Sequence, residues 1–470
     1  MVARASFPQV LLLSCYELGH QAFSLASALG FLERDGVDAA ALDLSVENLT
    51  EHAAAVGSAR VVAISAPMHT ALRLGTDAAR QVRAFNAGAH VCFFGYYAGL
   101  NAEHLLSAGY ADSAIAGEFE PALLTLVLAV MRGEFDPAAP PPGVRTGEHI
   151  SASVLQRVAF APPRREGLPT LENYARLRSN SGLRLAGYTE SSRGCKYVCR
   201  HCPVTPVYQG RFFVVPHDIV LGDIRAQVQA GARHITFGDP DFLNGPGHAQ
   251  RVVRAIHAEF PELTFDFTAR IPHLLRHSGL LPEMAAAGCA FVVSAIESLS
   301  DKVLAALEKG HTRADILHAL DLVQKAGMPL RPSLLPFTPW TTLDDYLELL
   351  AFVREKDLVD NIDPVQYSLR LLIPPGSALL QQHAPAPWLR ELDEPSFSYR
   401  WTHADVRMEA LHNQVSARVE KAEMQGEPAR STFAAVEELA FAFGGLAPPM
   451  PRNVPQRRPI PAGLTESWFC

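Results

Sequence analysis

The sequence has no excess of basic residues and no long hydrophobic run, and both absences exclude functions. Its 41 Lys and Arg residues are outnumbered by 49 Asp and Glu residues, which gives a formal net charge of −8 and an isoelectric point near 6.1. Nucleic acid is therefore not expected as a partner, because binding its phosphates requires a basic surface. The apolar run near the N-terminus is only about five residues long, too short for a signal peptide or a membrane span. We expect a cytoplasmic protein with no membrane partner.

The composition also argues against disorder and against a disulfide framework. Hydrophobic residues make up 48% and charged residues 19% of the 470 residues, which is typical of a folded enzyme with more than one domain. Seven cysteines are too few to form a disulfide framework in a chain of this length. Three of them, Cys15, Cys92 and Cys289, lie in apolar, strand-like runs and are interpreted as buried hydrophobic residues.

Short apolar runs alternate with amphipathic stretches in two series along the chain. The first series includes QVLLLSC, RVVAISAPM and HVCFFGYYA, and it predicts parallel strands in a doubly wound sheet. The second series predicts a partial (β/α)6 barrel, with its site at the C-terminal ends of the strands. We expect four segments: a Rossmann-type domain (1–136), a Pro-rich linker (137–185), the barrel (186–395), and a helical extension with a Pro-rich tail (396–470).

Three cysteines occur close together, just after the first strand-like run of the predicted barrel. Cys195, Cys199 and Cys202 form a C-x3-C-x2-C pattern. Three thiolates can hold a [4Fe-4S] cluster and leave one iron open for another ligand, whereas structural zinc sites have four protein ligands. The nearby histidines suit zinc poorly, because His201 lies between two of the cysteines and would strain the tetrahedron. The pattern therefore favours a cluster over zinc.

These residues resemble the cluster motif of radical S-adenosylmethionine (SAM) enzymes. The resemblance implies that the open iron binds the amino and carboxylate groups of SAM. It also implies that one electron cleaves the sulfonium to a 5′-deoxyadenosyl radical, with a reductant such as flavodoxin or ferredoxin as a partner. The residue before the last cysteine is usually aromatic in the family and packs on the adenine. His201 takes that position here.

Four further residues fall where this family contacts SAM. Gly238 and Asp239 follow the strand-like run HITF, at the place of the family's glycine-rich segment, and the resemblance implies contact with the amino group of SAM. A plain strand-to-loop turn would explain the same two residues. Arg270 and Glu297 end two later apolar runs, where side chains face a barrel's site. The family implies the SAM carboxylate for Arg270 and the ribose hydroxyls for Glu297.

The first domain resembles the cobalamin-binding domain that precedes many radical SAM domains. A doubly wound sheet offers a crevice to a flat ligand, with small residues such as Gly95 and Gly117 at its strand ends. The D-x-H-x-x-G motif that supplies the cobalt ligand is absent, and the nearest histidines, His20 and His69, are interpreted as loop or packing residues. Cobalamin bound without a protein ligand and a domain without cobalamin are both open.

The whole chain resembles a group of radical SAM proteins whose C-termini read Cys-Sec-Ala-Glu-Pro or Cys-Cys-Ala-Glu-Pro. The sequence ends at LTESWFC, which places Cys470 on the first residue of that tail. A selenocysteine UGA codon read as a stop would produce this end, and an ordinary terminal thiol is the alternative. Cys470 is thus a candidate catalytic residue.

We expect an enzyme that carries out radical group transfer or hydrogen abstraction on a small molecule. The alternatives are tail-assisted formation of a bond from carbon to arsenic or selenium, and a redox sensor that binds cluster and cobalamin without turnover.

Overall fold

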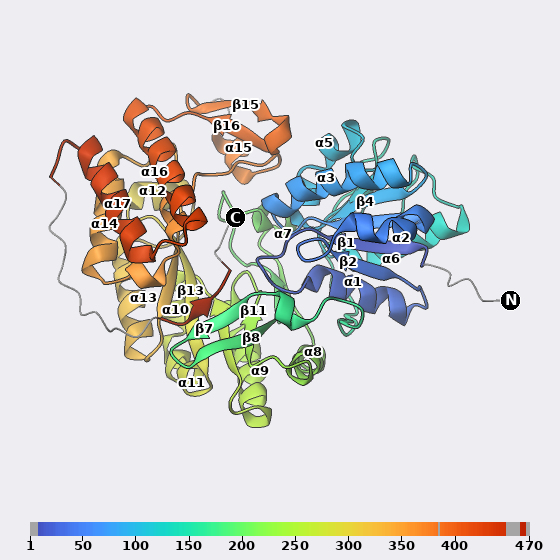
Figure 1. Ribbon diagram of the computed structural model, residues 1–470, viewed down its shortest axis with the longest axis horizontal. Coiled ribbons are helices and arrows are strands. Elements are labelled where there is room, and N and C mark those ends of the chain that lie inside the picture. The colour runs from blue at the N-terminus through green and yellow to red at the C-terminus, as the bar shows by residue number, and fades with distance from the viewer. Residues whose placement is uncertain (1–7, 384–385, 448–460, 467–470) are drawn as a thin grey trace.

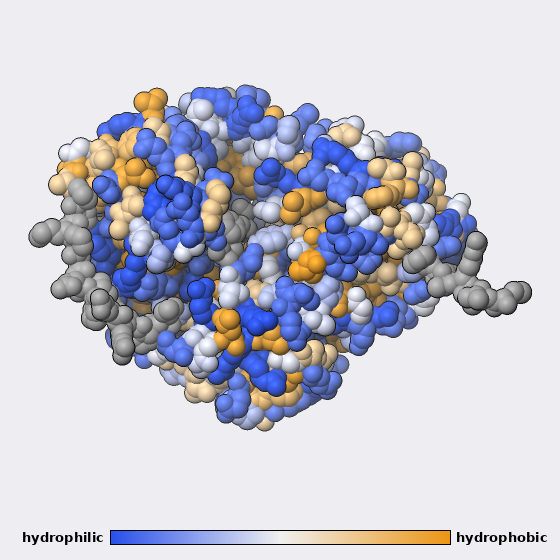
Figure 2. All heavy atoms as spheres, viewed as in Figure 1, coloured by the Kyte–Doolittle hydropathy of each residue, from blue (hydrophilic) through white to orange (hydrophobic). Residues whose placement is uncertain are grey.

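The computed structural model describes residues 8–383, 386–447 and 461–466. The described chain forms two α/β halves, one around each of two large sheets, with a helical extension packed on the second half (Figure 1). On the face shown in Figure 2, hydrophilic and hydrophobic residues are interspersed over both halves. None of the described helices is both long and apolar enough to cross a membrane.

The first sheet is doubly wound, as the sequence predicts. Its first five strands are parallel and only β6 is antiparallel. Because β2 and β3 lie on opposite sides of β1, the strand order reverses direction there and opens a crevice at the C-terminal strand ends. In spatial order the strands are β2 (Ala40–Asp43), β1 (Val10–Ser14), β3 (Val61–Ser65), β4 (His90–Phe94), β5 (Ser113–Ile115) and β6 (Val144–Arg145).

Helices cover both faces of this sheet, which is why its strands read as continuous apolar runs. Two helices bury apolar residues against one face, α1 (Phe23–Arg34) and α6 (Phe119–Arg132). The opposite face is covered by α2 (Ala53–Ser58), α3 (His69–Phe85) and α5 (Ala102–Ser107). A short helix, α4 (Tyr96–Leu100), follows β4 and packs against α7 (Val204–Tyr208) of the second half.

The second sheet is a curled half-barrel of seven strands. Five strands are parallel, and a hairpin strand and a C-terminal strand extend one edge. The predicted sixth barrel strand is reduced to an isolated parallel bridge between Phe337 and Arg370. In spatial order the strands are β14 (Leu330–Leu334), β13 (Cys289–Glu297), β12 (Thr264–Thr268), β11 (His234–Phe237), β8 (Gly182–Thr189), β7 (Arg176–Ser179) and β17 (Gly463–Leu464).

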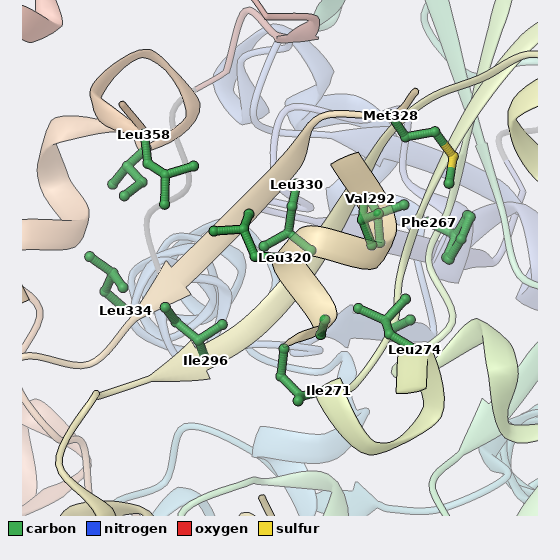
Figure 3. Close-up of a cluster of buried hydrophobic side chains, with 14 of the residues drawn as sticks. Phe267, Ile271, Leu274, Val292, Ile296, Leu320, Met328, Leu330, Leu334 and Leu358 are labelled. Carbon is green, nitrogen blue, oxygen red and sulfur yellow. The ribbon is translucent and has the colours of Figure 1, made fainter. Parts of the chain in front are cut away.

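The helices of the half-barrel pack on the outer face of the sheet. Figure 3 shows this core, where Val292 and Ile296 of β13 and Leu330 of β14 lie beside Leu320 of α13. Two of the helices begin with capping boxes, which fix where each one starts. The helices are α8 (His217–Gln229), α9 (Pro246–Glu259), α10 (Ile271–Arg276), α11 (Leu281–Ala286), α12 (Asp301–Ala306), α13 (Arg313–Lys325) and α14 (Leu343–Glu355).

The C-terminal part of the chain adds a helix pair, a small hairpin and a closing strand. The elements are α15 (Ala378–His383), β15 (Leu389–Asp393), β16 (Ser398–Trp401), α16 (Val406–Met424) and α17 (Ala429–Phe443). The closing strand β17 pairs with β7 at one edge of the half-barrel. At the other edge, Arg331 of β14 donates a hydrogen bond to the Ala462 carbonyl (3.3 Å). The segment from Ala462 to Glu466 therefore bridges the two edges of the open barrel.

Candidate functional site

The three clustered cysteines lie on one loop between the two halves of the molecule. The short strand β9 (Ser192–Gly194) leads into this loop and pairs with β10 (Phe212–Val214), so the loop is closed at its base. Gly194 adopts a φ of +75°, and a Cβ there would lie 2.4 Å from the Tyr208 ring and 2.5 Å from the Arg211 carbonyl oxygen. Only glycine fits the turn that starts the cysteine loop.

The thiols of this loop are mostly buried and act on one another electrostatically. Cys195 and Cys199 are 8% and 6% exposed. Burial and, to a lesser extent, the charges of Cys199 and Cys195 raise the pKa of Cys202 to about 12, so the three side chains lie near one another. In the described part of the chain, no three His, Cys, Asp or Glu side chains are placed around a common single-ion position. Coordination to a cluster would remove these thiol protons.

Arg270 reaches the cysteine loop from the end of β12. Its guanidinium carbon lies 3.6 Å from the centroid of the Tyr197 ring, and Tyr197 lies between the first two cysteines. One nitrogen donates to the Lys309 carbonyl, but Nε and Nη1 have no hydrogen-bond partner among the described residues although the side chain is buried. Unpaired donors of this kind are costly unless a ligand satisfies them. Arg270 therefore fits a bound carboxylate beside the cysteine loop.

Glu297 ends β13 and forms a small charged cluster with two residues of the site. Its Oε1 accepts hydrogen bonds from Lys309 (3.0 Å) and from His201 Nε2 (3.2 Å). Burial alone would raise the pKa of Glu297, but Lys309 and His201 lower it well below its usual range. The carboxylate is therefore ionised and can accept hydrogen bonds from hydroxyl groups. In the part of the chain that the structure describes, the Nδ1 atom of His201 has no hydrogen-bond partner.

Gly238 and Asp239 lie at the end of β11, where the sequence places them, but their contacts are internal. A Cβ on Gly238 would lie 1.8 Å from the Tyr188 hydroxyl, so the missing side chain makes room for that ring. The Asp239 carboxylate accepts hydrogen bonds from Ser191 N and Oγ (both 2.8 Å) and from Ser192 Oγ (2.5 Å). Asp239 thus ties the end of β11 to the strand that enters the cysteine loop.

Two cavities meet at Tyr188. The first, which we call the domain cavity, has a volume of about 190 Å³ and lies at the crevice of the first sheet. The second, the barrel cavity, has a volume of about 300 Å³ and lies on the inner face of the half-barrel, with Cys202 in its wall. Leu18, Tyr188, Gly238 and Pro240 line both cavities. The Tyr188 ring therefore forms part of a shared wall.

The domain cavity matches the expected place for a flat ligand and holds no histidine among its lining residues. The residues after β1, β3, β4 and β5 line it, including Gly95 and Gly117. The ring of His20 lines the barrel cavity instead, and His69 Nε2 is 2.6 Å from the Ser396 carbonyl oxygen. Among the described residues, the crevice thus offers no imidazole to a bound group.

A buried ionic cluster joins the two halves beside both cavities. Arg193 of β9 is 5% exposed and pairs with Glu118 (3.2 Å), Glu120 (2.6 Å) and Glu190 (2.9 Å). The Tyr208 hydroxyl donates to Glu118 (2.6 Å). Burial raises the pKa of Glu190 to about 8.

The sequence reasoning missed several residues that the structure brings to the site. Tyr197 carried a usable signal, since it is an aromatic residue inside the cysteine motif. Lys309 and Tyr188 carried none, because only folding brings them to Glu297 and Gly238. Cys470 lies outside the described residues.

The sequence comparisons find radical SAM proteins. Residues 189–353 match the model of the Radical SAM superfamily. A tRNA-2-methylthio-N(6)-dimethylallyladenosine synthase from Desulfosudis oleivorans is 30% identical over 199 residues, which cover 40% of this chain and 42% of that protein. A ribosomal protein uS12 methylthiotransferase RimO from Parabacteroides distasonis is 25% identical over 182 residues, 36% of this chain and 41% of that protein. The chain thus spans less than half the length of these relatives.

The structural comparisons extend over most of the chain. The cobalamin-dependent SAM radical enzyme OxsB, in its apo form, superimposes with a TM-score of 0.70 at 15% identity, covering 93% of this chain and 72% of that one. The radical SAM methyltransferase TsrM from Kitasatospora setae, with tryptophan and a SAM analogue bound, superimposes with a TM-score of 0.66 at 16% identity, covering 93% and 96%. Residues 189–353 therefore form a radical SAM domain, the domain type of enzymes that use a [4Fe-4S] cluster and SAM, within the fold of the cobalamin-dependent radical SAM enzymes.

Proposed function

We propose that this chain binds a [4Fe-4S] cluster through Cys195, Cys199 and Cys202 and cleaves SAM to transfer a one-carbon group to a small molecule. The observation that carries the proposal is Arg270, a buried guanidinium with two unpaired nitrogens, stacked on Tyr197 of the cysteine loop. A cation held there suits the carboxylate of SAM, because charge-assisted pairs with carboxylates are the strong ones.

The neighbouring side chains bind the rest of SAM, position the cysteine loop and exclude water. When bound, a cluster with one open iron would supply the electron that cleaves SAM. Glu297, held ionised by Lys309 and His201, accepts hydrogen bonds from the ribose hydroxyls. Asp239 positions the loop by holding Ser191 and Ser192. The aromatic and aliphatic residues around Cys202 keep water away from the reacting atoms.

Cobalamin is the proposed carrier of the transferred group, bound at the domain cavity without an imidazole ligand. Support comes from the position of that cavity at the switch point between β1 and β3. OxsB and TsrM, which share the fold, have solved structures with cobalamin bound. A small molecule is favoured over tRNA because the chain carries a net charge of −8, which repels a polyanion.

The cluster and its chemistry can be tested together. Anaerobically reconstituted protein should hold about four irons per chain and change its EPR spectrum when SAM is added, because only an open iron takes a new ligand. The triple variant Cys195→Ala, Cys199→Ala, Cys202→Ala should lose both. Cys92→Ala, in the core of the first sheet, is the matched control and should keep both.

Two outcomes would contradict the proposal. Iron retained in the triple variant would mean that other residues hold it. A cluster that binds SAM but never cleaves it under reduction would favour the redox sensor over the enzyme.

We also propose that the chain belongs to the group with the Cys-Sec-Ala-Glu-Pro tail, in which Cys470 would take part in the reaction. Support comes from Glu466, four residues before Cys470, which lines the barrel cavity and accepts a hydrogen bond from Tyr16 (3.0 Å). Cys470→Ala should therefore abolish product formation while the iron content stays unchanged. Full activity of this variant would exclude a role for Cys470 and, with it, the tail-assisted bonding of arsenic or selenium.

A further inference from the structure

The barrel cavity is lined by more negative than positive charge. The charged side chains that face it are Asp239, Asp266, Arg331, Asp363 and Glu466. Arg331 donates to Asp363 (3.0 Å) and to the Ala462 carbonyl, so its charge is already compensated. Asp239 is satisfied by the two serines described above. A cationic ligand is therefore favoured over an anionic one.

Asp266 and His20 both line this cavity and have hydrogen-bonding atoms without a partner among the described residues. Asp266 is 3% exposed, and its Oδ1 accepts from Thr236 (2.7 Å) and pairs with His234 Nε2 (2.8 Å). Within the described residues, no hydrogen bond reaches its Oδ2. His20 is 4% exposed, and its Nδ1 has no partner. Burial lowers the pKa of His20 to about 4 while the charge of Asp266 opposes this shift, so the ring is neutral and lies near the carboxylate.

Part of the wall is apolar and aromatic. Tyr188, Phe237, Phe291 and Val293 line it, and the Tyr188 ring packs on the His20 ring with centroids 4.8 Å apart. Such a wall suits the hydrocarbon body of a ligand, whereas the polar atoms of Asp266 and His20 fix one end.

We propose that the barrel cavity binds a substrate with a primary ammonium group on an apolar body. The ammonium donates to Asp266 Oδ2 and to a ring nitrogen of His20, which satisfies both groups. The inference deepens the proposed function by giving the chemical class of the substrate, and its role as a substrate site depends on that function. Binding itself needs neither SAM nor turnover.

The test is titration calorimetry of the full chain, with its cluster and without SAM, against three probes of one shape. Phenethylamine should bind, because only the amine forms a charge-assisted hydrogen bond with Asp266. The neutral 2-phenylethanol should bind at least about 10-fold more weakly. The anionic 3-phenylpropionate should not bind. Asp266→Asn should weaken phenethylamine about 10-fold or more and leave 2-phenylethanol unchanged. Asp321→Asn, at the exposed pair with Lys325, is the control and should bind like the unaltered protein.

A second variant distinguishes a loss of binding from a loss of folding. His20→Phe keeps a ring against Tyr188 and removes the nitrogen acceptors, so it should weaken phenethylamine severalfold in a folded protein. Equal or tighter binding of 3-phenylpropionate, no binding of any probe, or unchanged phenethylamine affinity in both folded variants would overturn the inference. Iron content and SAM cleavage, measured in the same preparation, report separately on the proposed function.

Discussion

At the scale of single residues, Arg270 shows how a buried charge can be prepared for a ligand. Its guanidinium is fixed by the Tyr197 ring on one face and by the Lys309 carbonyl at one nitrogen. Among the described residues, two of its nitrogens have no partner although the side chain is buried. Leaving buried donors unpaired lowers the stability of a protein. The two unpaired nitrogens of Arg270 therefore indicate a binding role more strongly than the presence of an arginine alone.

The corresponding prediction concerns SAM affinity. Arg270→Gln should weaken SAM binding by about 10- to 100-fold, because hydrogen bonds to charged groups contribute about 1.5–3 kcal/mol. The iron content should stay unchanged, because Arg270 is not one of the proposed cluster ligands. The measurement is the SAM concentration needed for half of the EPR change. Arg233→Gln, an exposed arginine next to β11, is the control. Loss of iron in Arg270→Gln would assign this residue to the cluster instead.

At the scale of elements, the cluster of Arg193 and three glutamates joins β9 to the start of α6. The strand β9 enters the cysteine loop, and Glu118 and Glu120 lie at the N-terminus of α6 in the first half. Carboxylates are favoured at this end of a helix by its dipole. The position of the cysteine loop is thereby tied to the crevice of the first sheet.

Removing the single cation of this cluster should be costly. Arg193→Met would leave the buried Glu118 and Glu120 side chains without their ionic partner and should lower the free energy of unfolding by about 3–5 kcal/mol. Chemical denaturation at neutral pH measures the change. Arg164→Met breaks a pair with Glu33 at the surface and should cost less than about 1 kcal/mol. If both variants lost the same free energy of unfolding, the buried cluster would contribute no more to stability than the surface pair.

The elements that could be predicted from sequence are those with a strong local pattern. Apolar runs such as Val61–Ser65 and His234–Phe237 became buried parallel strands because helices cover the sheet. The last predicted barrel strand, around Arg370, forms only a bridge with Phe337. The strand β17 could not be predicted, because a two-residue strand has no periodicity and depends on pairing with distant β7. Site residues followed the same rule: motif positions could be located, whereas Tyr188 and Lys309 depend on tertiary contacts.

At the scale of the whole molecule, the position of the domain cavity leads to a prediction about cobalamin. Protein produced with ample cobalamin should show corrinoid absorbance of a form that lacks an imidazole ligand. His20→Ala and His69→Ala should leave the spectrum unchanged, because neither residue lines the domain cavity. Met68→Trp should abolish binding by filling that cavity, whereas the exposed variant Glu51→Trp should not. A spectrum with a histidine ligand that disappears in either alanine variant would contradict the prediction.

The segment that bridges the two edges of the half-barrel also has a consequence for biosynthesis. The ribosome makes Ala462–Glu466 after every other described residue, so the sheet edges formed by β7 and β14 are complete before anything spans them. Leu464 and Glu466 belong to that segment and also line the barrel cavity. The wall of the barrel cavity is therefore complete only after this segment has docked.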